Sequence, residues 1–303
     1  MSRFWSGSAL SLGVVRSIVH GTFLFAVLAT SFSALGRLPV TILRPTGLMK
    51  LLPWSFYDLL LTPRGMFVLK SLLVVSLICG TLGFLTSLST KVSFLLVLFY
   101  QGLVRSFGHY NHDEMIAVYY LAVLAFTPCG DSFSLDHWTK SKAPNKSPFA
   151  YGYPIFLMQL LMAWLYFSSA LVQVRAAGMK YFSPDNLPVL SILHSLDNLH
   201  DTSFKLAFWL PQVRGALLYV VGIVLIWELM FPLAVFWRKS RWWILGFGVL
   251  FHISTLVFMN IFFPYQLAMY LVFVDWDRMA AWLNKPAFDT KKLKDAKVRS
   301  HKA

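Results

Sequence analysis

The chain has 303 residues, of which 57% are hydrophobic and only 13% are charged, whereas roughly a quarter of the residues in ordinary soluble domains are charged. A soluble domain of this size cannot cover so many apolar side chains, so the composition predicts repeated crossings of a lipid bilayer. It excludes a disordered chain, a disulfide scaffold and a nucleic-acid-binding domain. The net charge of +14 indicates cytoplasmic loops beside anionic headgroups, which makes membrane lipids the expected partners.

Long apolar segments recur along the chain and predict an all-α fold. A helix needs about 20 residues to cross the hydrocarbon layer. The apolar segments are 10–35, 65–87, 92–107, 115–128, 153–176, 216–237, 242–262 and 265–274, of which the third, fourth and eighth are short. We predict a polytopic membrane helix bundle with about eight transmembrane helices and with interfacial helices in the long loops. It forms one domain over 1–280, followed by a basic, disordered cytoplasmic tail over 281–303.

Basic residues set the expected orientation. The tail is rich in Lys and Arg, a short turn contains Arg238, Lys239 and Arg241, and the loop after the fourth segment holds three lysines. An even number of spans, about eight, places all of them on one face, which the positive-inside rule makes cytoplasmic. We therefore expect an integral protein of the cell (inner) membrane with both termini cytoplasmic, although the basic first loop falls on the opposite face.

Ionisable side chains inside the spans are costly and are functional candidates. Arg16 and His20 lie four residues apart on one helix face and are interpreted as an interfacial anchor with a satisfied histidine. His112 belongs to a polar cluster at 109–114, where a solvated helix cap and a functional site both remain open. Its HxxH spacing alone does not predict a metal site.

The fifth span carries a polar stripe. Gln159, Tyr166 and Gln173 are separated by seven residues each, and Ser169 lies on the same helix face. In lipid such a stripe must face protein or a polar cavity. Hydrogen bonding between helices and the wall of a cavity are both consistent with it.

Glu228 and His252 fall in the middle of the sixth and seventh spans. Pro232 interrupts the backbone one turn after Glu228, and Gly248 permits close helix approach one turn before His252. A buried pair that serves assembly alone is one interpretation. We favour two walls of one site, because both residues stand at the depth where burial costs most.

A turn is predicted where the fourth span ends, over 128–136. Its sequence is Pro-Cys-Gly-Asp-Ser-Phe-Ser-Leu-Asp. We expect Gly130 to supply left-handed backbone and Asp131 and Asp136 to cap the turns that follow.

These features occur in a recognisable order. They are Asn111-His112, the turn 128–136, the run 166–175 with Gly178, Glu228 to Pro232, Arg238 or Arg241, Gly248 with Phe251-His252, and Phe263. The chain resembles the HTTM superfamily, the transmembrane domain shared by vitamin K-dependent γ-glutamyl carboxylases and many bacterial relatives. The resemblance covers roughly 10–275 and is that of a bacterial-type, stand-alone member.

The resemblance implies a central cavity that holds a reduced quinone. In the carboxylases a lysine deprotonates the hydroquinone, and the position that matches this lysine here is Gln173. His112, His252 and Glu228 match the family's two histidines and its acidic residue. A glutamine amide is not basic, and the soluble domain that follows the carboxylase membrane part is not found in this sequence. Both departures argue against peptide carboxylation.

Two hypotheses from different classes follow. The first is a membrane enzyme, carboxylase- or lyase-like or quinone-dependent, with His112, Glu228, His252 and Gln173 as catalytic residues. Tyr166, Phe251, Phe263 and Tyr265 would contact the quinone or another lipid-soluble cofactor. The second is a non-catalytic membrane module that binds a lipid or a partner membrane protein, for example in peptide or toxin maturation. A transporter is less favoured, because the sequence shows no inverted repeat.

Overall fold

The computed structural model describes residues 7–108, 114–140, 146–196 and 205–284, and every regular element in these ranges is a helix. The predicted all-α fold is confirmed. The α-helices are α1 (Ala9–Ala29), α2 (Phe32–Leu35), α3 (Trp54–Leu60), α4 (Pro63–Leu82), α5 (Thr86–Ser106), α6 (Met115–Ala125), α7 (Leu135–Lys140), α8 (Pro148–Ala177), α9 (Asn186–Leu196), α10 (Arg214–Met230), α11 (Leu233–Phe236), α12 (Arg241–Met259), α13 (Pro264–Met269) and α14 (Trp276–Leu283). The 3₁₀ helices are η2 (Val40–Ile42), η3 (Gly47–Leu51), η4 (Gly178–Phe182), η5 (Lys205–Val213) and η6 (Tyr270–Phe273).

Local sequence explains where the long helices begin and end. α4 starts at the Thr62 cap, whose hydroxyl accepts from the Gly65 amide at 3.0 Å, and Pro63 takes the first helical position. It ends at Gly83, whose φ of 69° is left-handed. α8 starts in the same way, with a Ser147 cap and Pro148 at the first helical position.

Six helices are long and apolar enough to cross a membrane: α1, α4, α5, α8, α12 and the stretch Leu206–Met230 that includes α10. Their outward faces carry large exposed apolar side chains such as Phe67 and Trp243, which is the surface that lipid requires. The protein is therefore an integral membrane protein of the all-α class.

The other two predicted spans form shorter elements. α6 has 11 residues, and the segment 265–274 becomes α13 and η6. At 1.5 Å per residue α6 is about 17 Å long. Most of its residues are buried, so it lies inside the protein, where short or irregular helices are tolerated at membrane depth. The count of about eight spans stays a prediction.

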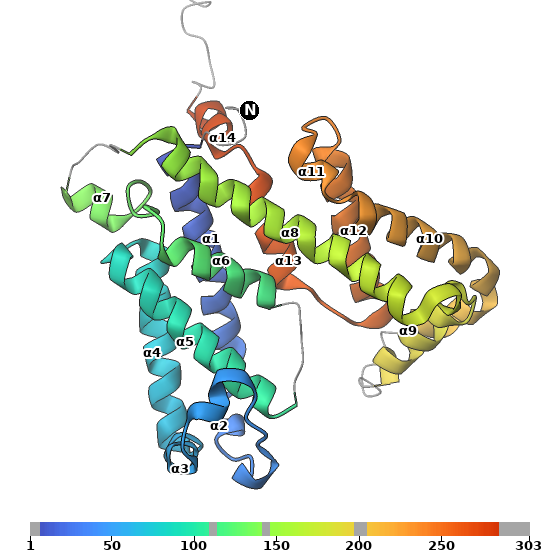
Figure 1. Ribbon diagram of the computed structural model, residues 1–303, viewed down its shortest axis with the longest axis horizontal. Helices are drawn as coiled ribbons and strands as arrows, with labels where there is room; N and C mark the ends of the chain where they lie inside the picture. Colours follow the sequence, from blue (N-terminus) through green and yellow to red (C-terminus); the bar gives the residue numbers. More distant parts are fainter. Residues whose placement is uncertain (1–6, 109–113, 141–145, 197–204, 285–303) are drawn as a thin grey trace, which may run out of the picture.

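α8 joins the two halves of the molecule. Figure 1 shows it running from the group formed by α1, α4, α5 and α6 to the group formed by α9, α10 and α12. It packs against α6 and α1 on one side and against α10, α11 and η6 on the other. The two long loops contain short helices as expected, η3 and α3 in the first and η4, α9 and η5 in the second.

Contacts from distant parts of the chain meet at one end of the bundle. The Ser11 hydroxyl, at the start of α1, donates to Asp277 of α14 at 3.2 Å. Arg238, in the turn before α12, lies 4.0 Å from Asp275. The Gly7 amide donates to the Pro148 carbonyl at the start of α8. The starts of α1, α8 and α12 therefore lie beside α14.

Arg16 is fully buried, so the interpretation of this residue as an interfacial anchor is wrong. Its guanidinium donates to the Cys129 carbonyl at 3.0 Å, to the Phe133 carbonyl at 2.6 Å and more weakly to the Thr81 carbonyl at 3.4 Å. The turn 128–136 folds over α1, and the end of α4 lies beside it. Arg16 thus joins α1, the turn 128–136 and the end of α4. It supplies hydrogen bonds that their backbone carbonyls would otherwise need from water.

The turn 128–136 differs from its predicted conformation. The left-handed residue is Phe133, with φ of 49°, and not Gly130. Glycine is required at 130 because a Cβ atom would lie 2.7 Å from the Thr86 side chain. Asp136 caps a helix earlier in the chain, since its carboxylate accepts from the Leu85 and Thr86 amides at the start of α5.

Replacing Arg16 with Met should lower the free energy of unfolding by about 3 kcal/mol, because three backbone carbonyls, one of them fully buried, lose a charged donor. Thermal unfolding in detergent measures the effect. Arg37→Met is the matched control, since Arg37 is exposed. Equal stability of the two variants would contradict the role assigned to Arg16.

Candidate functional site

The polar stripe predicted on the fifth span lies on α8 and faces other helices. Gln159 is buried, and its amide donates to the Val272 carbonyl of η6 at 3.1 Å. Tyr166 is also buried, two turns further along. Ser169 and Gln173 follow, with the Gln173 amide donating to the Ser169 hydroxyl at 3.1 Å. The stripe therefore connects α8 to the C-terminal helices along its length.

Tyr166 lies at the centre of a chain of hydrogen bonds. The Tyr270 hydroxyl of η6 donates to the Tyr166 hydroxyl at 2.6 Å. The same Tyr166 hydroxyl lies 2.6 Å from Nε2 of His252 on α12. His252 is 3% exposed, and its Nδ1 atom is buried without a partner. The structure thus brings together Tyr166 and His252, two of the predicted site residues.

Glu228 and Gln173 form the second half of the cluster. The Glu228 carboxyl on α10 is hydrogen-bonded by the Ser169 and Gln173 side chains. Glu228 Oε2 and Gln173 Oε1 remain buried without partners. Because Ser169 accepts from Gln173, its own proton is free for Glu228. Glu228 and His252 are therefore each linked to α8, Glu228 through Ser169 and Gln173 and His252 through Tyr166, so they belong to one cluster without being bonded to each other.

Aromatic rings enclose these polar groups. Phe231 stacks on Tyr166 with ring centroids 4.3 Å apart, and Trp227 lies 4.9 Å from the same ring. Phe263 and Phe251 lie 5.0 and 5.1 Å from the His252 ring. The Trp227 indole N–H donates to the Ile244 carbonyl at 2.9 Å, which fixes α10 against α12. Such a shell excludes water and strengthens the interactions inside it.

Gly248 makes room for the tyrosine at the end of the hydrogen-bond chain. A Cβ atom at this position would overlap the Tyr270 hydroxyl and would lie 3.0 Å from the Trp227 ring. The sequence indicated close helix approach at Gly248. The group that approaches is the hydroxyl of Tyr270.

Tyr181 of η4 lies beyond the end of α8, close enough to Glu228 for the two groups to interact electrostatically. Burial, and then the Glu228 carboxylate, raise the pKa of Tyr181 to about 12. Its phenol therefore stays protonated at neutral pH. It adds a neutral polar group to this end of the cluster.

The remaining predicted site residues have different outcomes. His112 lies outside the described residues. Tyr265 is buried and packs against Phe23 of α1, with ring centroids 5.1 Å apart. Within the described ranges, no group of three or more His, Cys, Asp and Glu side chains could hold a metal ion.

Sequence reasoning missed Tyr270 and Trp227. Both are aromatic residues within apolar runs, where a ring is normally a packing residue. The available signal was Gly248, whose position one turn before His252 predicted that a neighbouring group approaches there.

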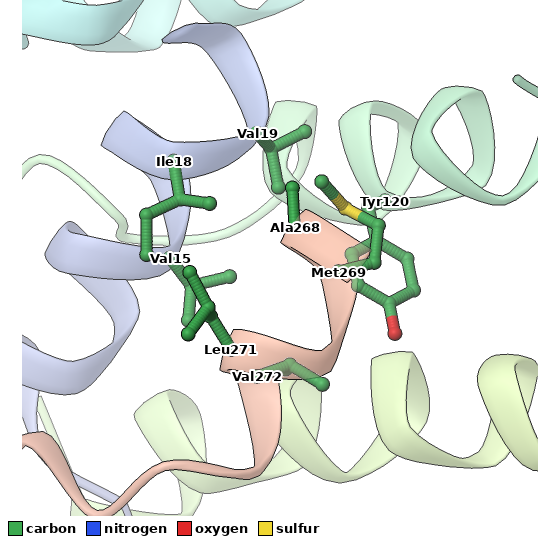
Figure 2. Close-up of a pocket in the computed structure, with 8 residues that line it drawn as sticks. All are labelled: Val15, Ile18, Val19, Tyr120, Ala268, Met269, Leu271 and Val272. Carbon is green, nitrogen blue, oxygen red and sulfur yellow. The ribbon is translucent and has the colours of Figure 1, made fainter. Parts of the chain in front are cut away.

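A separate apolar hollow lies between α1, α6 and α13–η6, and Figure 2 shows the side chains that line it. Its empty volume is about 140 Å³, but it has no room for a water molecule. Its one polar lining group, the Tyr120 hydroxyl, donates to the Met158 carbonyl of α8 at 2.7 Å. The hollow is a packing feature and not a ligand site.

The fold and the buried cluster define a polytopic all-α membrane protein with a polar interior at the junction of α8, α10 and α12. A family model described as the HTTM domain matches residues 7–277. The chain belongs to the HTTM domain family, which confirms the resemblance seen in its motifs. Neither the search of curated proteins nor the search of solved structures found a match.

Gly248→Ala should destabilise the protein by about 1–3 kcal/mol, because the added methyl displaces the Tyr270 hydroxyl from a filled site. Gly246→Ala, on the same helix, is the matched control, since a Cβ atom there meets nothing within 4 Å. Thermal unfolding of both variants checks the difference. A Gly248→Ala protein as stable as the control would show that the contact is unimportant.

Proposed function

We propose that the protein is a membrane enzyme whose cluster at α8, α10 and α12 takes a lipid-soluble cofactor, a reduced quinone being the leading candidate. The observation that carries the proposal is the gathering of three unpartnered buried polar atoms in this one cluster, His252 Nδ1, Glu228 Oε2 and Gln173 Oε1. A cluster that serves assembly alone is expected to satisfy its polar atoms, since each unsatisfied one costs about 1–3 kcal/mol.

The residues present fit a quinone in chemical type. Aromatic side chains from α10, α12 and the following loop supply a ring-lined environment, and the unpartnered atoms supply hydrogen-bonding groups for ring oxygens. Phe251, Phe263 and Tyr166 are the rings that would contact the cofactor. Tyr265 stays a candidate from the sequence alone. A reduced quinone, when bound, supplies electrons and ring-hydroxyl protons.

The chain's own residues would handle the protons. Glu228 can accept or hold a proton at Oε2, and His252 exchanges one with the Tyr166 hydroxyl through Nε2. Gln173 is held by Ser169 and by Glu228, so it orients the substrate and the carboxyl without exchanging a proton. His112 is retained as a candidate on its match to the family's first histidine.

Peptide carboxylation is not the reaction that these residues favour. Gln173 stands at the position that matches the carboxylases' lysine, and its amide cannot remove a proton from a hydroquinone. A proton acceptor must then be a carboxylate or an imidazole. Glu228 and His252 are the two such side chains in the cluster. Glu228 would accept at its unpartnered Oε2, and His252 would accept at Nε2 from the Tyr166 hydroxyl. This favours a quinone-dependent reaction with another substrate.

A non-catalytic module is the second candidate. The cluster also ties helices together, through Trp227 to Ile244 and through Gln159 to Val272. A lipid or a partner membrane protein would then be the ligand, and the same polar groups would serve folding. The two candidates predict different losses in Glu228 and His252 variants, quinone binding for the enzyme and folded yield for the structural module.

Glu228→Gln and His252→Gln should each weaken binding of reduced menadione about tenfold, because one hydrogen bond to the ligand is lost. Equilibrium binding to protein in lipid nanodiscs measures this, together with extraction of quinone that copurifies. Ser254→Ala, also on α12, is the control, because the Ser254 hydroxyl donates to the Leu250 carbonyl of its own helix.

Folded yield separates the two candidates. The enzyme proposal expects near-normal yield of Glu228→Gln and His252→Gln with reduced quinone binding. Reduced yield of both variants, with no quinone bound by the unmodified protein, would favour the structural module.

For orientation we propose that α6 and α13–η6 each carry the chain across the membrane, which gives eight crossings with both termini cytoplasmic. The contacts of Ser11 with Asp277 and of Arg238 with Asp275 support this arrangement. An eight-crossing chain has the start of α1, the turn at 237–240 and α14 on one face. Six crossings would put that turn opposite the termini, and its basic residues would then violate the positive-inside rule.

Cysteine labelling on intact cells tests the orientation. Lys239→Cys should resist a membrane-impermeant thiol reagent until the cells are lysed, whereas Lys50→Cys, in the first loop, should react at once. Both lysines are exposed, and the parent chain provides the blank. Immediate labelling of Lys239→Cys would support six crossings and overturn the proposal.

A further inference from the structure

We infer that Tyr166 and Tyr270 are positioning residues that hold His252 in one tautomer, with the proton on Nδ1, so that this N–H is offered to an oxygen acceptor on the ligand. The assignment of the tautomer follows from hydrogen bonds within the chain. The part that concerns a ligand rests on the proposed function.

The direction of the hydrogen bonds fixes the tautomer. Tyr270 donates to the Tyr166 oxygen at 2.6 Å, and a phenol has a single proton of its own to donate. The other close partner of the Tyr166 hydroxyl is His252 Nε2, also at 2.6 Å. If Nε2 donated as well as Tyr270, the Tyr166 oxygen would accept two hydrogen bonds. The hydroxyl proton of Tyr166 would then have neither of these two partners as an acceptor. Nε2 therefore accepts, and in a neutral imidazole the proton is then on Nδ1.

His20 provides a comparison within the same protein. It is also a fully buried histidine in a membrane-spanning helix, and its Nδ1 lies 2.9 Å from the Arg16 carbonyl one turn earlier. Since a carbonyl can only accept, His20 uses its Nδ1 proton on its own helix. His252 uses Nε2 to reach Tyr166 and keeps an unpartnered Nδ1, whereas the unpartnered nitrogen of His20 is Nε2, the acceptor of its ring. A donor fixed in this way suits a carbonyl or deprotonated hydroxyl oxygen.

Packing holds both tyrosines in place. Tyr166 is fixed by the stacked Phe231 ring, and the Tyr270 hydroxyl fits against Gly248, where even a methyl group would overlap it. Three separate elements, α8, η6 and α12, must therefore be assembled before the imidazole is held in one state. Such support of a reacting group by neighbouring residues is how sites achieve fixed geometry.

Nitrogen NMR of the intact protein in lipid nanodiscs, labelled with ¹⁵N-histidine, tests the inference. The His252 signals are assigned by their loss in His252→Gln. The unmodified protein should give a protonated, pyrrole-type shift for Nδ1 and an unprotonated, pyridine-type shift for Nε2. Tyr166→Phe and Tyr270→Phe keep the rings but remove the hydroxyls, so both should move His252 toward the Nε2–H form. Gly248→Ala should act in the same direction.

Tyr219→Phe is the matched control, because Tyr219 is exposed on α10, and its spectrum should be unchanged. Binding of reduced menadione should weaken several-fold in the Tyr166 and Tyr270 variants. A proton on Nε2 in the unmodified protein, or an unchanged tautomer in both tyrosine variants, would overturn the inference. If the tautomer is as expected but the unmodified protein binds no quinone, the proposed function fails and the positioning role stands.

Discussion

The pair of short hydrogen bonds at the Tyr166 hydroxyl is the interaction on which the C-terminal half of this protein depends. The membrane interior supplies no water to satisfy a buried phenol or imidazole, so these groups must satisfy one another. Tyr166 does this for α12 through His252 and for η6 through Tyr270. The stacked ring of Phe231 and the close approach at Gly248 follow from the need to hold these groups at contact.

Two buried polar centres in the chain each keep unpartnered atoms, Nε of Arg16 in the first, but they differ in what their remaining groups bind. Arg16 directs its terminal nitrogens to backbone carbonyls of the turn 128–136 and of α4, and its position explains the compact fold of α1, α4 and that turn. The centre on α8 keeps unpartnered atoms on His252, Glu228 and Gln173. The first arrangement serves architecture. The second keeps three polar atoms unpartnered within a shell of aromatic rings, which is the feature on which the proposed binding site rests.

The sequence predicted the helical class and most of the cluster, because both depend on local rules. Spacing by seven placed Tyr166 and Gln173 on one face of α8, and the cost of burial singled out Glu228 and His252. The sequence did not identify Tyr270, because nothing in the local pattern distinguishes a functional tyrosine in an apolar run from a packing residue. Arg16 was misinterpreted because its carbonyl partners lie more than 60 residues away in the chain, and no local pattern shows that the turn folds back over α1. The prediction of left-handed backbone at Gly130 was wrong for the same reason. Glycine is needed there because the Thr86 side chain, from another helix, packs against it.

Gln173 limits the chemistry more than any other residue of the cluster. A lysine at this position would stand beside Glu228, where the two charges would attract and a mobile proton would be shared. The amide instead donates to Ser169 and to the carboxyl, and it leaves its own oxygen unpartnered. Where the carboxylases have a strong base, this cluster therefore has an amide that is fixed by hydrogen bonds. In the proposed function, proton transfer then depends on Glu228, whose partners are an uncharged amide and a hydroxyl, and on His252, whose partner is a phenol. Under the proposed function, such a site orients a ring-bearing ligand and transfers its hydroxyl protons. The amide at 173 does not supply the base with which carboxylation begins in the carboxylases.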